Sequence, residues 1–250
     1  MIYLKTSDEI KIMSQAGEIA AAALEEVKNN ILPGKSTLQL NDIAEKVIKK
    51  LGGEASFKKV HGYKYCVCTT VNEQVVHGLP TNYKLKEGDI LGIDLGAYYR
   101  GYHSDLAHTF PVGTIAPGTK RFLKLGERAL WDALSVAKKG KRVGDISNSI
   151  QSIIEGAGFA VVRELVGHGV GKNLHEDPLI PGVGEPGTGP ELKVGMTFAV
   201  EVIYNQGGKE VELLSDGWTF VTKDREPSGL FERTIAITEK GTKMLTPWPN

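Results

Sequence analysis

Apolar positions recur at helical spacing in two stretches near the start of the chain. The first stretch begins at Ser7-Asp8-Glu9, which supplies an acceptor cap and acids in the first turn, and it ends before Pro33-Gly34. The second, an amphipathic run from Leu38 to Leu51, stops at Gly52-Gly53, as helices commonly do. The sequence therefore predicts two helices, the first with an apolar face formed by Ile10, Met13, Ile19, Ala22, Ala23 and Val27.

The same order of features returns in the second part of the chain. Pro117-Gly118 precedes a helical run from about Lys120 to Lys139, and a second helix with a regular isoleucine pattern follows it. The glycines that flank the second helix are 18 positions apart in both parts, and the offset is 106: Gly34 and Gly52, then Gly140 and Gly158. We therefore predict a duplicated unit, helices first and strands after, with halves at about 1–116 and 117–250.

Segments rich in β-branched and aromatic residues follow the helices in each half. We expect strands at 65–71, 90–95, 196–204, 211–214, 218–221 and 230–237. Residues 181–190 contain a Gly-x-Gly-x-x-Gly pattern, which binds dinucleotides where it follows a strand and opens a helix. Prolines interrupt the pattern here and a strand comes after it, so we predict an ordinary loop.

Composition narrows the class of protein. The chain has 250 residues, of which 41% are hydrophobic and 24% charged, the balance of a soluble globular protein. Its formal net charge is 0, which argues against a dominant nucleic-acid or anionic-membrane surface. The longest stretch without Asp, Glu, Lys or Arg, Leu106 to Thr119, has 14 residues, whereas a membrane span needs about 20. Charges at the N-terminus do not fit a signal peptide, so we expect a cytoplasmic protein.

Two acids lie in a predicted hairpin. The segment 88–110 is typical of two strands that reverse near Tyr99-Arg100-Gly101. If the turn is centred on Tyr99-Arg100, Asp94 and Asp105 become direct neighbours across the strands. Like charges in that position destabilise a sheet unless a cation neutralises them. The pattern indicates either a cation site or two acids that face solvent.

Two glutamates lie on otherwise apolar strand faces. Glu201 shares a face with Ala199 and Ile203, and Glu232 shares one with Leu230 and Thr234. A buried carboxylate without a partner costs several kcal/mol or stays protonated. Each glutamate alone is also compatible with an edge strand. Three histidines complete the set of candidates, namely His77 before a Gly-Leu-Pro turn, His168 between glycines, and His175 seven positions later.

Four carboxylates and one histidine fit a site for two divalent cations. Four negative charges balance two such ions, and oxygen ligands with one imidazole suit Mn, Fe, Co or Zn. Paired metals of this kind hold a hydroxide and polarise a carbonyl in aminopeptidases. Neither a Gly-x-Ser-x-Gly elbow nor a P-loop occurs in the sequence, so serine hydrolases and nucleotide hydrolases lose support.

The chain resembles the type I methionine aminopeptidases over nearly its whole length. The resemblance implies an α+β, pita-bread (creatinase/aminopeptidase) fold, with a central curved antiparallel sheet, helices outside, and one catalytic domain over 1–250. The matching segments are CTTVNEQVVHGLP (68–80), GDILGIDLGAYYRGYHSDLAHTF (88–110), GHGVGKNLHEDP (167–178), TFAVEV (197–202), DGWTFVTKD (216–224) and FERTIAIT (231–238).

The resemblance also implies a role for each site residue. The metal ligands would be Asp94, Asp105, His168, Glu201 and Glu232, with Asp105 and Glu232 shared between the two metals. His77 would contact the substrate near the scissile amide, His175 would bind the substrate carbonyl, and Glu201 would carry the proton. The pocket for the methionine side chain would be lined by Tyr63, Cys68 and Trp218.

Two positions depart from the family pattern. Val202 stands where proline usually follows the glutamate, and Leu106 stands where a hydroxyl residue is frequent. Both departures lean toward the Xaa-Pro aminopeptidases and dipeptidases, which share the fold. Those relatives usually carry an added N-terminal domain and lack the VNEQVVHG context of His77. A nonenzymatic binding protein on this fold is a further alternative, although such relatives typically lose metal ligands.

The resemblance implies a cytoplasmic metalloaminopeptidase that removes the initiator methionine from nascent proteins with a small second residue. Its partners would be nascent polypeptide N-termini and, transiently, the ribosome. We expect neither nucleic-acid specificity nor membrane attachment, and the family default is a monomer.

Overall fold

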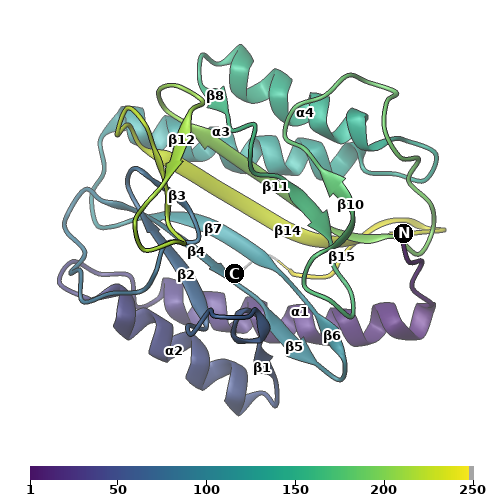
Figure 1. The fold of residues 1–250 in the computed structure, drawn as a ribbon, viewed down its shortest axis with the longest axis horizontal. Coiled ribbons are helices and arrows are strands. Elements are labelled where there is room, and N and C mark those ends of the chain that lie inside the picture. Colours follow the sequence, from purple (N-terminus) through teal and green to yellow (C-terminus); the bar gives the residue numbers. More distant parts are fainter. Residues whose placement is uncertain (248–250) are drawn as a thin grey trace.

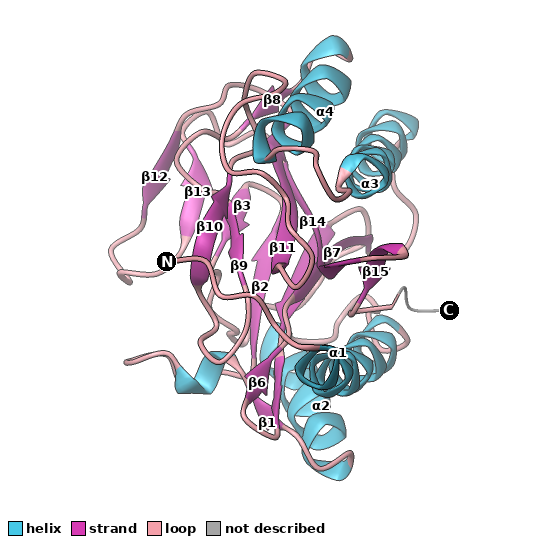
Figure 2. Ribbon diagram, turned by 90° about the vertical axis from the view of Figure 1, so that its right-hand side faces the viewer, coloured by secondary structure: helices cyan, strands magenta, loops and turns pink. Residues whose placement is uncertain are grey.

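Four helices cover one face of a curved antiparallel sheet in the computed structural model, which describes residues 1–247 (Figures 1 and 2). The helices are α1 (Ser7–Lys28), α2 (Thr37–Lys50), α3 (Pro117–Val136) and α4 (Val143–Gly156). A short 3₁₀ turn, Phe57–Lys59, lies outside this layer. In the part of the chain that is described, no helix is both long enough and apolar enough to cross a membrane.

The predicted helices are confirmed, with shifts at their ends. Helix α1 is capped by Thr6 rather than Ser7. The reason is a capping box, in which the Glu9 amide donates to the Thr6 hydroxyl while the Thr6 amide donates to the Glu9 carboxylate. Ser7 has Ile10 three residues on, so it could form no such pair. Helix α3 begins at Pro117, because the fixed φ of proline suits the first helical position.

The main sheet has nine strands, and its continuous path runs β10-β9-β11-β14-β7-β4-β2, with β8 beside β11 and β15 beside β14. Two three-stranded sheets, β1-β5-β6 and β12-β13-β3, flank it. The strands of the first half are β1 (Glu54–Ala55), β2 (Val67–Val71), β3 (Gln74–Val76), β4 (Ile90–Leu95), β5 (Ala97–Tyr99), β6 (Tyr102–His103) and β7 (Leu106–Pro111).

The strands of the second half include the two longest in the molecule. They are β8 (Ala160–Val161), β9 (Gly167–Gly169), β10 (Glu176–Ile180), β11 (Thr197–Asn205), β12 (Val211–Leu213), β13 (Phe220–Thr222), β14 (Ser228–Thr238) and β15 (Gly241–Met244). Every predicted strand has a counterpart, and residues 181–190 form a loop, as expected. The short strands were not predicted, because two or three residues give no readable alternation.

The two halves meet at the centre of the sheet. Strand β14 of the second half pairs with β7 of the first, with Glu232 opposite Ala107. Each half packs two helices on its own strands, α1 with α2 and α3 with α4. Gly34 and Gly140 both have positive φ, 87° and 83°, at the predicted offset. The origin of the halves by duplication stays a prediction.

The hydrophobic core lies between the helices and one face of the sheet. Helix α3 approaches β11 and β14 closely, and the Tyr204 hydroxyl donates to the Phe122 carbonyl at 2.6 Å. Gly126 permits this approach, because an added Cβ would lie 2.5 Å from the Tyr204 hydroxyl and 2.6 Å from the Phe231 ring. Packing of the helices on one face leaves the opposite face of the sheet for a cavity.

We therefore expect Gly126→Ala to lower the free energy of unfolding by about 1–3 kcal/mol, the usual cost of overpacking a filled core. Gly118→Ala is the matched control, since Gly118 lies in the same helix and an added Cβ meets nothing within 4 Å. Urea denaturation of both variants measures the difference. Equal midpoints for the two variants would contradict this account of the helix contact.

Candidate metal centre and substrate cavity

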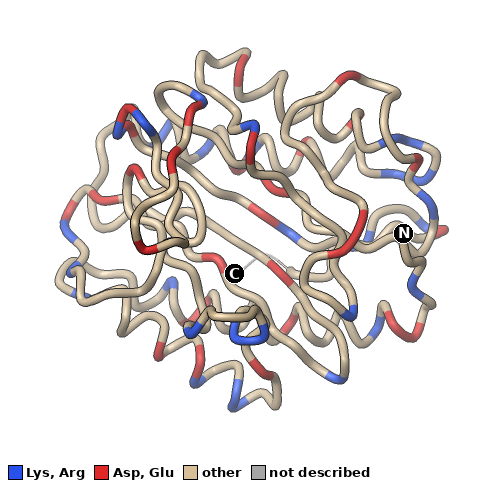
Figure 3. Tube along the Cα trace, in the orientation of Figure 1, with Lys and Arg blue, Asp and Glu red and all other residues tan. Residues whose placement is uncertain are grey.

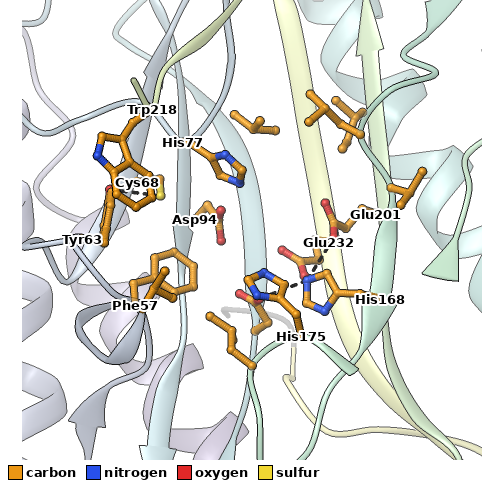
Figure 4. A pocket seen from close by; sticks show the side chains of 17 residues that line it. Phe57, Tyr63, Cys68, His77, Asp94, His168, His175, Glu201, Trp218 and Glu232 are labelled. Carbon is orange, nitrogen blue, oxygen red and sulfur yellow. Dashed lines mark hydrogen bonds and ion pairs between the residues drawn. The ribbon is translucent and has the colours of Figure 1, made fainter. Parts of the chain in front are cut away.

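A cavity of about 210 Å³ opens on the face of the sheet opposite the helices (Figure 4). Acidic positions lie on the central strands of this sheet together with one basic position, Arg233 directly after Glu232 on β14, and both kinds are interspersed over the outer helices and loops (Figure 3). All ten predicted site residues line the cavity: Tyr63, Cys68, His77, Asp94, Asp105, His168, His175, Glu201, Trp218 and Glu232.

Glu201 and Glu232 are direct neighbours across β11 and β14. Glu232 is 2% exposed, and the Glu201 side chain is 12% exposed. Their sequence neighbours Val202 and Phe231 point the other way and pack with α3 in the core. The alternation of strand side chains therefore places two carboxylates side by side on the cavity face.

The predicted pairing of Asp94 with Asp105 is wrong in register. Asp94 lies opposite Ala107 in the β4–β7 ladder, and Tyr99 lies opposite Tyr102 in the β5–β6 ladder. The turn is therefore Arg100-Gly101, where both residues have positive φ, 48° and 92°. Two-residue hairpin turns of this kind favour glycine at the second position, which Tyr99-Arg100 could not supply.

Asp105 nevertheless reaches Asp94. It lies between β6 and β7, outside both ladders, where its amide donates to the Thr234 hydroxyl at 3.1 Å. The carboxyl groups of Asp94 and Asp105 are in hydrogen-bonding contact. Asp105 is two residues before Ala107, which lies opposite both Asp94 and Glu232, so strand alternation places its side chain on the same face as these acids.

His168 faces these acids from β9. Its Nδ1 lies 3.0 Å from the Gly169 carbonyl oxygen, which favours a proton on Nδ1 and leaves Nε2 free to bind an ion. Nε2 lies 3.7 Å from Asp105 Oδ2 and 3.5 Å from Glu201 Oε1. Asp105, His168 and Glu232 each offer one ligand atom, and these atoms all lie within 4.8 Å of one another.

The electrostatics of the cavity call for a cation. Burial raises the pKa of Asp94 to about 7 and raises the pKa values of Asp105, Glu201 and Glu232 well above their usual range, and the neighbouring carboxylates add to this for the last three. Burial also lowers the pKa of His168 to about 4. Within the described chain, no Lys or Arg lines the cavity.

Unsatisfied oxygens test whether metal ions fit the site. One carboxylate oxygen on each of three acids is fully buried and has no hydrogen-bond partner, namely Asp94 Oδ1, Asp105 Oδ1 and Glu232 Oε1. Orphaned buried acceptors are rare in native proteins, since each costs the full desolvation of the group. Acceptors without donors, beside a neutral imidazole, are the ligand set of a divalent transition metal.

His77 and His175 lie on either side of the acids (Figure 4). His77 has φ 56°, a left-handed conformation in which histidine is enriched but which most residues avoid. Its ring contacts Phe220 edge-on, with centroids 6.1 Å apart. The His175 ring lies 4.3 Å from the His168 ring, centroid to centroid. Both imidazoles can therefore reach a molecule bound over the acids.

The far end of the cavity is apolar. The Tyr63 hydroxyl donates to the Val67 carbonyl at 2.9 Å and lies 3.1 Å from the Cys68 sulfur, and the Trp218 ring packs edge-on against Tyr63 at 5.0 Å. Phe57, which sequence analysis missed, closes this end with an edge-on contact to Tyr63. In the sequence, a phenylalanine in a short polar turn shows no pattern that tells a residue lining a cavity from one in the hydrophobic core.

The two departures from the family pattern lie away from the cavity. Val202 and Leu106 are both fully buried, and they pack in the hydrophobic core on the helix side of the sheet. Neither residue is among those that line the cavity. Their identities therefore do not bring the site closer to that of the Xaa-Pro enzymes.

Comparison with known proteins agrees with the geometry. Residues 11–239 match the model of metallopeptidase family M24. The chain is 49% identical to "Methionine aminopeptidase 1" of Bacillus subtilis over 98% of this chain and 99% of that protein. The structure of a methionine aminopeptidase from Thermotoga maritima superposes with a TM-score of 0.96 at 45% identity, covering 98% of this chain and 99% of that one.

A prolidase from Pyrococcus furiosus is more distant, with a TM-score of 0.81 and 26% identity over 99% of this chain and 66% of that chain. The chain therefore belongs to metallopeptidase family M24 and has the pita-bread fold. Within that family, its near-full-length matches at 40–49% identity make it a member of the methionine aminopeptidases. The predicted fold and family are confirmed.

The raised carboxyl pKa values predict how pH and metal act on stability. In the metal-free protein, Asp94 has a pKa of about 7 against an ordinary value of 3.8. As the pH rises between these values, the Asp94 carboxyl ionises in the unfolded chain but stays protonated in the folded one, so the free energy of unfolding falls. A divalent cation binds the ionised carboxylates and stabilises the folded state.

We therefore expect the melting temperature of chelator-treated protein to fall between about pH 5 and pH 8, and added Mn²⁺ to raise it most at the upper end. Thermal scans at several pH values, with and without Mn²⁺, measure this. A melting temperature that Mn²⁺ does not change at any pH in this range would contradict a metal centre at these acids.

Proposed function

We propose that this protein removes the N-terminal methionine from nascent polypeptides whose second residue is small. The observation that carries the proposal is the group of four carboxylates and one imidazole in the wall of a cavity whose far end is apolar, where no described Lys or Arg is among the lining residues. The membership of the chain among methionine aminopeptidases supports the same substrate. A thioether side chain suits a pocket of aromatic rings and a thiol.

The metal ligands in this proposal are Asp94, Asp105, His168, Glu201 and Glu232. The four negative charges of the acids would balance two divalent ions. When bound, such ions polarise the scissile carbonyl and acidify a water molecule. The identity of the metal is not set by these ligand types, because Mn, Fe, Co and Zn all accept them.

The side chains around the acids supply the rest of the chemistry. Glu201, held in the centre of β11, accepts a proton from the attacking water and delivers it to the leaving amine. His175 donates a hydrogen bond to the substrate carbonyl oxygen, where negative charge develops. His77 contacts the scissile amide from the opposite side. Tyr63, Cys68 and Trp218 hold the methionine side chain and so orient the bond that breaks.

The cellular setting belongs to the same proposal. Nascent N-termini are exposed during synthesis, so the enzyme would work in the cytoplasm and meet the ribosome transiently, as a monomer. Zero net charge is compatible with a brief contact of this kind rather than a stable complex with RNA. Cleavage before proline is the less supported alternative, because the prolidase match is weaker and the Val202 and Leu106 departures face the core.

A competition assay tests substrate choice. Metal-stripped protein receives equal amounts of Met-Ala-Ser and Ala-Pro-Ala, with and without Mn²⁺ or Co²⁺, and mass spectrometry follows the products. We expect metal-dependent loss of methionine alone, because the apolar pocket binds the thioether. Cleavage of Ala-Pro-Ala would move the protein to the Xaa-Pro enzymes, and no cleavage with either metal would favour a binding protein.

A substitution tests the metal ligands. Asp105→Asn keeps the side-chain volume but removes one of the four negative charges that would hold the metals, so we expect turnover of Met-Ala-Ser to fall below detection. Asp8→Asn is the control, because Asp8 is exposed and pairs with Lys11 at the surface. Turnover by Asp105→Asn at the parent rate would show that Asp105 is not a ligand.

A further inference from the structure

We propose that Lys5 is a positioning residue for His175 and acts through a buried ion pair with Glu176. The inference rests on the proposed function, in which His175 binds the substrate carbonyl. Lys5 lies in the segment that precedes α1, far in sequence from the cavity, and it does not line the cavity. Lys5 also lies outside all the segments that match the methionine aminopeptidases.

The ion pair is almost completely removed from solvent. Lys5 Nζ lies 2.5 Å from Glu176 Oε2, and both side chains are only 5% exposed. The ammonium also donates to the Tyr3 carbonyl at 3.3 Å. A second bond fixes the backbone, because the Lys5 amide donates to the Gly195 carbonyl at 2.7 Å, next to the start of β11. The position of the ammonium is therefore set by the main sheet.

The carboxylate of Glu176 organises the loop that carries His175. Its second oxygen accepts from the Asn173 amide at 3.1 Å, while the Gly171 amide donates to the Asn173 carbonyl at 3.0 Å. Gly171 must lack a side chain, because an added Cβ would lie 2.6 Å from both Glu176 carboxylate oxygens and from Lys5 Cε. The loop thus folds tightly around the ion pair.

His175 depends on this loop more than His168 does. Residues 171–175 belong to no helix or strand, whereas His168 lies in β9, which pairs with β10 and β11. His175 immediately precedes Glu176, so a shift of the loop that the Glu176 carboxylate holds at Asn173 also shifts His175. A buried ion pair is a weak source of stability compared with apolar packing, but it constrains the geometry of its two partners.

The test compares Lys5→Met with Lys11→Met. Methionine has nearly the length of lysine but no charge, so in Lys5→Met the Glu176 carboxylate loses its cationic partner and keeps the Asn173 amide. Lys11 is the control, since it is exposed and forms a surface pair with Asp8. With Met-Ala-Ser as substrate, we expect Lys5→Met to lower kcat about tenfold or more with little change in KM. The reason is that a displaced His175 imidazole stabilises the charge on the carbonyl oxygen in the transition state less well.

A double variant separates positioning from a general structural effect. If Lys5 acts through His175, Lys5→Met should have no further effect on kcat in a His175→Ala background. The affinity for Mn²⁺, measured by calorimetry, should remain that of the parent, because His168 and the other acids lie on strands and the Asp105 amide is bonded to Thr234 of β14. Independent losses of kcat in the double variant, or parent-level kcat in Lys5→Met, would overturn the proposal.

A second variant keeps the test valid if Lys5→Met folds poorly. Glu176→Gln retains an oxygen that can accept from the Asn173 amide but removes the charge. It should show the same selective loss of kcat, and the double variant Lys5→Met/Glu176→Gln should recover part of it. Absence of any Met-Ala-Ser cleavage by the parent protein would instead count against the proposed function, so the two failures are distinguishable.

Discussion

Mutual repulsion among four carboxylates that are largely withdrawn from water is the constraint on which the rest of the site depends. Glu201 and Glu232 are cross-strand neighbours, and Asp94 and Asp105 contact each other beside them. A flexible scaffold would relieve such repulsion by moving the charges apart or exposing them. The long central strands β11 and β14 prevent this, because they pair with each other over nine residues and each also pairs with a strand on its other side. The acids must therefore be protonated or share cations, and the chemistry follows from the second state.

The two faces of the sheet have opposite effects on stability, and the apolar face offsets the cost of burying the acids on the other. Alternation along β11 and β14 sends one set of side chains into the core beneath α3 and the other set into the cavity. The core face is filled by large apolar groups and by the close approach at Gly126. The helices therefore stabilise the sheet from one side, and the other side holds polar groups that oppose folding. Loops and small sheets around the cavity position the remaining groups.

Much of the fold was predictable because its helices and long strands have clear periodicity and end signals. The glutamates could be singled out because an acid on an apolar strand face is conspicuous. Register was not predictable, since it depended on a turn one residue further along at Arg100-Gly101. As a result, Asp94 and Asp105 were predicted to be direct cross-strand neighbours. In the structure, the two acids that lie directly opposite each other are Glu201 and Glu232. Phe57 escaped notice because its role arises only from packing against Tyr63.

The joining of the halves through β7 and β14 has a consequence for the order of events in synthesis. Asp94 and Asp105 are translated first, while His168, Glu201 and Glu232 come from the part of the chain made later. An emerging first half therefore has two carboxylates and no imidazole of the cluster, too few ligands to retain a metal ion firmly. In the proposed site, metal capture requires closure of the pair formed by β7 and β14, so hydrolytic capacity arises only after Glu232 has been synthesised.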